Sequence, residues 1–300
     1  MEKNSDSDPD NDIQTMVVSL GSRFIKAAYS GEKTCRYVSE KVHIRPDSED
    51  KVLVEPGPDT IPILDTLANI INHKHALISA LLLCWSEQYT DKLQPHQTRL
   101  VLAVASTDPS LLDELGTVAF DDLAVLKLCI LTPGEAVSLY EGAPSCVVLD
   151  IGYRLSRLEV FVDWVMVDRE EVTRGGCNVE GNLTDTGNDE IIFKEDSCGK
   201  TIPAILEKFL KTFENISTVI VTGSTSFRFT PSDLSAKCLD HTGNNLKISY
   251  RLAPERNKSS WLGASIVPEL SCCQHRFYEK EQWRMHPEYV QLLIPESKTL

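Results

Sequence analysis

The sequence lacks any apolar run long enough to span a bilayer. Its longest run, Ala76 to Trp85, is interrupted by Ser79, whereas a spanning helix needs about 20 apolar residues. The first fourteen residues are acidic and polar, unlike a secretory signal, which begins basic and continues apolar. These features predict a soluble intracellular protein without membrane insertion.

Positive charge is also scarce. Lysine and arginine number 30 against 44 aspartates and glutamates, so the formal net charge is −14. Such an excess of negative charge opposes nonspecific binding to nucleic acid or to an anionic membrane. No run of basic residues marks nuclear import. We therefore expect no nucleic-acid partner.

Metal-ligand and nucleophile patterns are missing as well. The nine cysteines form no CxxC pair and no cysteine/histidine ligand spacing, which is typical of reduced, buried thiols. His73 and His75 are two residues apart, so they do not share a helix face. No serine/histidine/aspartate or cysteine/histidine grouping has a spacing that marks a nucleophile. We predict no catalytic residue and no metal ligand.

Two similar strand–turn–strand segments are present, one in each half of the chain. The first runs from Met16 to Tyr29 around Gly21, and the second runs from Val147 to Val162 around Gly152. A tight glycine turn can direct backbone N–H groups at a phosphate, while an aspartate at the strand end can face a metal. The two copies predict a two-lobed molecule that closes around one ligand.

Between and after these segments, β and α patterns alternate. This alternation favours an α/β fold with a mixed sheet. The predicted strands are 99–105, 125–131, 146–150, 157–162, about 170–174 and 218–222. The predicted helices are 109–120 with Asp108 as N-cap, 134–140, 201–213, 231–239, 260–272 and a short one within 278–290. Residues 63–89 have helical apolar spacing, with a break near 73–75, whereas 1–14, 45–62 and 178–198 are predicted to be disordered or loops.

Taken in order, these motifs resemble the actin family. Residues 16–32 and 148–156 resemble its two phosphate hairpins, 136–140 the helix that joins its lobes, and 219–225 its adenosine turn. The most specific stretch, residues 253–266, is similar to actin's proline-glutamate-arginine segment and the tryptophan-led helix after it. The resemblance implies the two-lobed fold, with ribonuclease H-like repeats, that actin shares with heat-shock ATPases and sugar kinases.

The resemblance also implies that the small subdomains 2 and 4 of actin are reduced or absent. Only a loop is expected between the first hairpin and the helix at Ile63, and only about two dozen residues separate Gly176 from the helix at Thr201. The implied domains are a disordered acidic tail at 1–14, a first large lobe at 15–142 to which 262–300 returns, and a second large lobe at 143–261.

Loss of the small subdomains has a geometric consequence by this resemblance. A subunit that keeps only the barbed-end face can dock on the pointed end of an actin-like filament and leave no site for the next subunit. The pattern Asp150-x-Gly152-Tyr153-Arg154-x-Ser156 is similar to that of the family member that ends the short filament of dynactin, the cargo adaptor of dynein. The implied function is a non-catalytic pointed-end cap that supports microtubule transport.

This reading implies particular partners and a particular location. The partners are actin-like filament subunits and other pointed-end subunits of dynactin, and the chain is not a homo-oligomer. The location is the cytoplasmic, microtubule-associated cytoskeleton. The partner-binding candidates at the cleft are Ile25, Leu139, Tyr140, Arg256 and Trp261. The alternative is a nuclear subunit of a chromatin-remodelling complex that grips a partner helix with the same face; an ATPase or sugar kinase is a third hypothesis.

Nucleotide is a separate question. The candidate nucleotide-binding residues carried over from the family are Gly21, Ser22, Lys26, Asp150, Gly152, Gly223, Ser224 and Thr225. Several family positions have changed. Ser19 stands at the first hairpin's aspartate, and Gly134 (or Glu135, with a slipped register) at the water-orienting glutamine. Arg157 stands at the nearby histidine. No cofactor is therefore certain, and ATP or ADP is possible without hydrolysis. The alternative is a collapsed cleft whose phosphate space is filled by Tyr153 and Arg154.

Overall fold

The computed structural model describes residues 13–39, 43–44, 61–62, 73–86, 93–106, 108–180, 188–239 and 249–285. The acidic tail predicted at 1–14 lies outside this part except for its last two residues, and so does the segment 63–72. Among the described residues, no helix combines the length and the hydropathy that crossing a bilayer requires.

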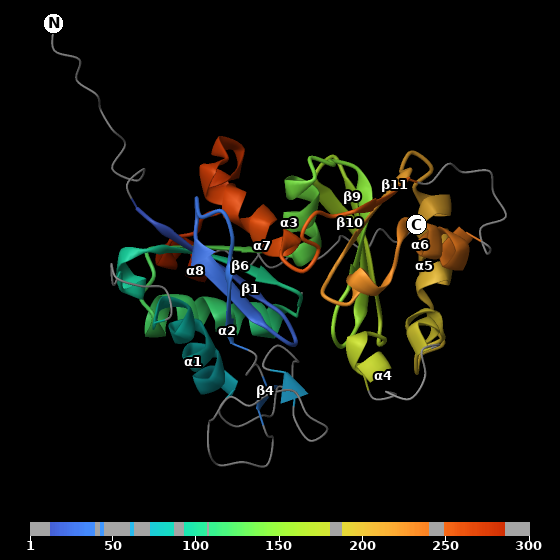
Figure 1. Cartoon of the computed structure of the whole chain (residues 1–300). Coiled ribbons are helices and arrows are strands. Elements are labelled where there is room, and N and C mark those ends of the chain that lie inside the picture. Colours follow the sequence, from blue (N-terminus) through green and yellow to red (C-terminus); the bar gives the residue numbers. More distant parts are fainter. Residues whose placement is uncertain are drawn as a thin grey trace, which may run out of the picture.

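The first half of the chain forms a five-stranded mixed sheet in the order β3-β2-β1-β6-β7 (Figure 1). Strand β2 runs antiparallel to both neighbours, and β6 runs parallel to both of its own. The strands are β1 (Thr15–Leu20), β2 (Ile25–Tyr29), β3 (Arg36–Ser39), β6 (Arg99–Val104) and β7 (Lys127–Leu131). Helix α1 (His73–Ser86) precedes β6, α2 (Pro109–Thr117) precedes β7, and α3 (Pro133–Tyr140) follows it.

The second half repeats this architecture. Its sheet has the order β10-β9-β8-β11-β12, with the same sequence of antiparallel and parallel pairs. The strands are β8 (Cys146–Ile151), β9 (Ser156–Val162), β10 (Val165–Val172), β11 (Thr218–Thr222) and β12 (Ser249–Leu252). Helices α5 (Ile202–Thr212), α6 (Pro231–Leu239) and α7 (Ser259–Ile266) occupy the places of α1, α2 and α3. The chain is therefore an internal duplication of one mixed α/β unit.

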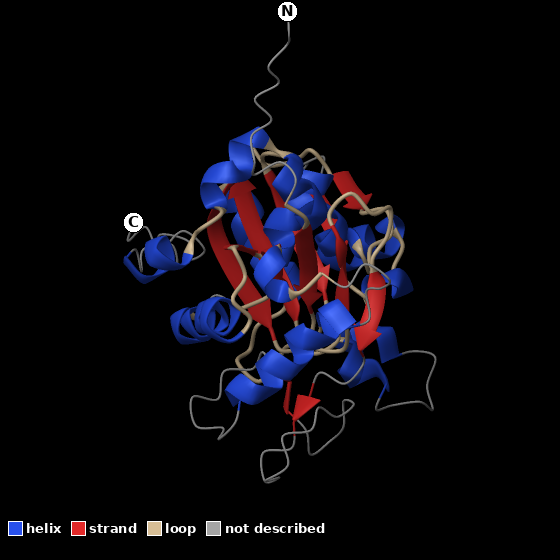
Figure 2. Ribbon diagram, turned by 90° about the vertical axis from the view of Figure 1, so that its left-hand side faces the viewer, coloured by secondary structure: helices blue, strands red, loops and turns tan. Residues whose placement is uncertain are grey.

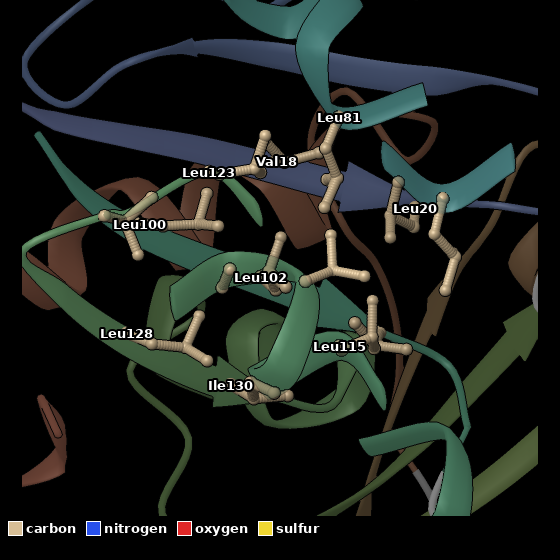
Figure 3. Packing of buried hydrophobic residues seen from close by; sticks show 14 of the residues in the cluster. Val18, Leu20, Leu81, Leu100, Leu102, Leu115, Leu123, Leu128 and Ile130 are labelled. Carbon is tan, nitrogen blue, oxygen red and sulfur yellow. The ribbon is translucent and has the colours of Figure 1, made fainter. Parts of the chain in front are cut away.

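Each sheet is covered on both faces, as Figure 2 shows for the strands lying between helices. Side chains alternate between the two faces of a strand. On β1 and β6, Val18, Leu100 and Leu102 point toward α1 and α2, where they meet Leu81 and Leu115 (Figure 3). Intervening side chains form the opposite core with α3 and α7. Helices α3 and α7 pack closely on each other between the two sheets (Figure 1).

Local sequence explains where the helices begin. Each of α2, α3 and α5 has a proline in its first turn and an N-cap side chain that accepts a backbone N–H: Asp108 from Ser110, Thr132 from Glu135, and Thr201 from Ala204. Proline lacks the N–H that would be left without an intrahelical partner there, and the cap satisfies one of the remaining donors. The predicted N-cap at Asp108 is confirmed.

Several predicted boundaries are wrong. The helix predicted at 260–272 ends at Ile266, because Pro268 cannot continue it, and 3-10 turns Val267–Glu269 and Ser271–Arg276 follow. The strand predicted near 170–174 is the longer β10. Residues 45–62 were predicted as a loop, but their last two residues form strand β5 (Ile61–Pro62), which pairs with β4 (His43–Ile44). Strands β3 and β12 were not predicted.

The remaining elements are short. Residues 178–198, predicted as a loop, contain the end of helix α4 (Gly176–Glu180) and the 3-10 turn Asn188–Phe193. Helix α2 runs into a π turn at Val118–Asp122, and 3-10 turns lie at Pro95–Gln97 and Ser226–Arg228. Helix α8 (Lys280–Met285) places Trp283 in the core of the first half, where its ring lies against Gly116.

Candidate functional site

A cavity of about 1190 Å³ lies where the two halves meet. The β1–β2 turn and the β8–β9 turn both line it, so the duplicated hairpins face one space. The end of β11, the segment before α7, part of β10 and the segment after β6 also line it. Tyr153 and Arg154 line this cavity together with residues of the first turn.

The two hairpin turns have the same geometry. In each, the glycine N–H donates to the carbonyl oxygen three residues later, from Gly21 to Phe24 and from Gly152 to Leu155, with both distances 3.1 Å. A Cβ atom on Gly152 would lie 2.9 Å from that carbonyl oxygen and one on Gly21 3.2 Å from its own. Close approach of the backbone therefore explains glycine at both positions.

Strand register places a cation at the same position in each hairpin. In the first, Ser19 is the cross-strand partner of Lys26, and in the second Asp150 is the partner of Arg157. Both Lys26 and Arg157 line the cavity. Only the second hairpin has a carboxylate opposite its cation, because the first has Ser19, whose hydroxyl lies 3.1 Å from that of Ser260.

Asp150 is surrounded by fixed cations. The Arg157 Nη1 atom lies 3.8 Å from its Oδ2. Burial raises the pKa of Asp150 from its ordinary value, and Arg157, Lys26 and Arg169 oppose that rise. Among the described residues, no three histidine, cysteine or acidic side chains gather so that they could hold a metal ion. Ser19 occupies the position in the first hairpin that Asp150 occupies in the second. The hairpins therefore offer one carboxylate, and cations already compensate its charge. This arrangement does not fit a divalent metal.

Lys26 is not a solvent-facing lysine. Its ammonium donates to the backbone carbonyl of Asn257, and burial lowers its pKa from the ordinary value. Its ammonium therefore bridges β2 to the segment before α7 at the cavity wall.

The turn after β11 lies directly against the second hairpin. Thr225 donates its backbone N–H to Ile151 and its hydroxyl to Gly152, at 3.0 and 2.9 Å. Gly223 has φ +96°, and a Cβ there would lie 2.3 Å from Asp150 Oδ1. Seven of the eight candidate nucleotide-binding residues line the cavity, and Thr225 lines an adjoining hollow of about 330 Å³ with Ser224 and Phe227.

Gly134 stands where the family resemblance places a water-orienting glutamine, and a neighbouring carboxylate takes up the space beside it. A Cβ on Gly134 would lie 1.9 Å from Glu159 Oε2, so the Glu159 carboxylate occupies the space of a side chain at 134. Glu135, the alternative register, is held in a two-point ion pair by Arg276. Neither Gly134 nor Glu135 lines the cavity. The described site therefore has no side chain from these two positions that can orient a water in it.

A buried charge cluster joins the two halves beside the cavity. Glu159 accepts from the Thr132 hydroxyl at 2.9 Å and lies 3.5 Å from Arg169. Arg169 also donates to the Ala105 carbonyl and pairs with Glu171. Burial raises the pKa of Glu159, and Arg169 and Arg157 oppose that rise. Because Thr132 and Ala105 belong to the first half and the charges to the second, these bonds tie the halves together.

The cavity is cationic although the chain is acidic. Seven basic side chains line it against four carboxylates, and three of those carboxylates, Asp150, Glu170 and Glu171, already pair with cations. The basic residues are Arg23, Lys26, Arg154, Arg157, Arg169, Lys200 and Arg256. Arg23 of the first turn stacks over the Tyr153 ring of the second, 4.8 Å from its centroid.

Two partner-binding candidates are wrong. Ile25 and Trp261 are fully buried, because Ile25 points into the core with α1 and α2, and the Trp261 indole N–H donates to Val17 at 3.0 Å within the opposite core. Leu139 and Tyr140 are half-buried at the end of α3. Arg256 lines the cavity and donates to the carbonyls of Ser226 and Phe229.

The Glu159–Arg169 cluster was missed from the sequence. A usable signal was present: Glu159 follows Leu158 in an alternating strand that is otherwise apolar from 158 to 162, and Arg169 is its direct cross-strand partner. Opposite charges on facing strands indicate a pair. The sequence alone did not give the register between β9 and β10, which sets Arg169 opposite Glu159.

A comparison with protein-family models finds no match for this sequence, and a comparison with curated proteins finds none either.

Proposed function

We propose that this chain is a divergent, non-catalytic member of the actin-related family that caps the pointed end of the short actin-like filament of dynactin. The observation that carries the proposal is the duplicated unit with paired hairpins around one cavity, from which the family's catalytic side chains are missing. A subunit whose role is structural needs the two-lobed frame and does not need an orienting glutamine or a metal carboxylate pair.

The end of the molecule formed by α3 and the β9–β10 turn is the proposed contact face. Trp164 and Val165 at that turn are exposed by 43% and 63%. The Trp164 backbone N–H donates to the carbonyl oxygen of Pro144, which follows α3 in the chain, at 2.9 Å. Exposed aromatic side chains of this kind are enriched among residues that dominate binding energy.

The capping function predicts slower filament growth. Purified chain added to preformed actin-like filaments whose barbed ends are blocked should stop subunit addition at the pointed end. Trp164→Ser should weaken capping about tenfold or more, as expected for loss of an aromatic hot spot. Fluorescence-based elongation assays measure both effects.

The control variant removes an apolar side chain that is about as exposed as Trp164 but lies outside the proposed contact face. Leu82 on α1 is 44% exposed, and Leu82→Ser should leave capping unchanged. Pointed ends that keep growing at saturating concentrations of this chain would contradict the proposal. Sedimentation of native extract then separates the alternatives, because co-migration with chromatin-remodelling subunits would favour the nuclear function.

A further inference from the structure

We propose that the adjacent thiols of Cys272 and Cys273 bind a monovalent copper ion. Their Sγ atoms lie 3.9 Å apart in the 3-10 turn that follows α7. Cys272 is exposed, whereas Cys273 is buried in the core that α3 and α7 form against the first sheet. An ion can therefore reach the pair from solvent through Cys272. This proposal does not depend on filament capping or on the cavity between the halves.

The distance between the two sulfur atoms suits one shared ion. Two metal–sulfur bonds of about 2.3 Å, the length found in zinc–thiolate sites, span 3.9 Å when they meet at an angle of about 116°. That angle is close to trigonal. A third position on the ion is then left for a small ligand from solvent, such as water or a free thiol.

The same geometry disfavours a disulfide between the two cysteines. The peptide bond that joins them is trans, which spaces their Cα atoms about 3.8 Å apart, closer than the roughly 4.4–6.8 Å usual for disulfides. An S–S bond here would be strained and readily reduced. Burial and the adjacent thiol also raise the pKa of Cys273 to about 11, so at neutral pH it holds its proton and exchanges slowly with disulfides.

The type and number of ligands select the ion. Thiolate sulfur favours soft ions such as monovalent copper, whereas carboxylate and water favour hard ones. Among the residues that the structure describes, no three cysteine, histidine or acidic side chains gather so that they could hold a metal, and structural zinc almost always takes four ligands. A soft ion of low coordination number therefore fits this pair better than zinc.

The backbone around the pair is fixed before any ion arrives. The Cys273 N–H donates to the Leu270 carbonyl at 2.9 Å. At the other end of the turn, the Arg276 guanidinium makes a two-point ion pair with Glu135 of α3. Binding therefore orders little additional chain, which lowers the entropic cost of association.

Binding exchanges two protons for one ion. Each thiol loses its S–H bond, two copper–sulfur bonds form, and the two protons pass to solvent. Copper enters and remains monovalent, so the step needs no oxidant or reductant.

The first test is a competition for copper between the full chain and bathocuproine disulfonate, whose monovalent copper complex is coloured. The titration is made without oxygen at pH 7.5, with ascorbate to keep copper monovalent. We expect the chain to withdraw one equivalent of copper from the chelator. A chain that withdraws none would overturn the proposal.

Two serine variants test the assignment to this pair. Cys272→Ser replaces an exposed sulfur with a harder oxygen, so it should weaken copper binding at least tenfold. The matched control is Cys198→Ser, because Cys198 is also an exposed cysteine and lies in the second half of the chain, before α5. It should bind copper as the unaltered chain does. Unchanged affinity in Cys272→Ser, or an equal loss in Cys198→Ser, would contradict the proposal.

Cys273→Ser should also weaken copper binding at least tenfold, and thermal melting checks that this buried substitution leaves the chain folded. If it does not fold, Cys272→Ser decides the outcome alone. Zinc without copper should bind the unaltered chain and Cys272→Ser equally weakly. Zinc binding that Cys272→Ser abolishes would show a zinc site instead and would overturn the choice of ion.

Discussion

Gly263→Ala is expected to lower the free energy of unfolding by about 3 kcal/mol or more, as for severe overpacking of a core. A Cβ atom at Gly263 would lie 1.7 Å from the carbonyl oxygen of Ala136. Both atoms belong to helices, so no side-chain rotation relieves the overlap. Helix α7 would have to move away from α3, and that movement would open the apolar core containing Trp261. Urea denaturation followed by circular dichroism measures the loss.

Gly142→Ala is the matched control for that measurement. Gly142 has φ +60°, and a Cβ atom added there would have no neighbour within 4 Å, so alanine costs only the backbone conformation, about 1–2 kcal/mol. If the two alanine variants were equally stable, the close approach of Gly263 to Ala136 would not limit the side chain at position 263.

The α3–α7 contact also shows where sequence reasoning reached its limit. The Trp261 helix and the helix at Ala136 were both predicted, because the pattern of residues within a helix is a local feature. Their crossing could not be predicted, because residues far apart in the sequence set how closely two helices approach. Trp261 was accordingly expected at an exposed cleft, whereas the crossing buries it completely.

The hairpins give a different result. Glycine turns and alternating strands are local patterns, and the structure places both turns at one cavity as their duplication predicted. The charges inside the cavity depended instead on register. Lys26 donates to the Asn257 carbonyl in a distant segment, and Glu159 lies opposite Arg169, its cross-strand partner; local sequence patterns reveal neither contact. Strand order, β3 and β12 included, was likewise set by long-range pairing.

Arg169→Met is expected to destabilise the protein by about 3–5 kcal/mol at pH 8, as for a buried ion pair that loses one partner. Glu159 would remain buried with its charge uncompensated by the arginine that lies 3.5 Å away. Burial already raises the pKa of Glu159, and removal of Arg169 should raise it further. A raised carboxyl pKa means that the folded state holds a proton that the unfolded chain releases.

Stability of the variant should therefore fall as pH rises from the unfolded glutamate value, about 4.3, through the folded one, and the deficit should shrink toward pH 5. Glu171 also loses a partner in this variant. Burial raises the pKa of Glu171, but Arg157 and Arg169 lower it by more, so that it lies below the ordinary value. Loss of Arg169 should therefore also reduce stability more at high pH than at low pH. The double variant Glu159→Gln/Arg169→Met removes the stranded charge and keeps a group that can accept from Thr132, so it should recover most of the loss and titrate little. A single-variant deficit that is independent of pH would instead assign the effect to lost packing and to the lost bond to Ala105.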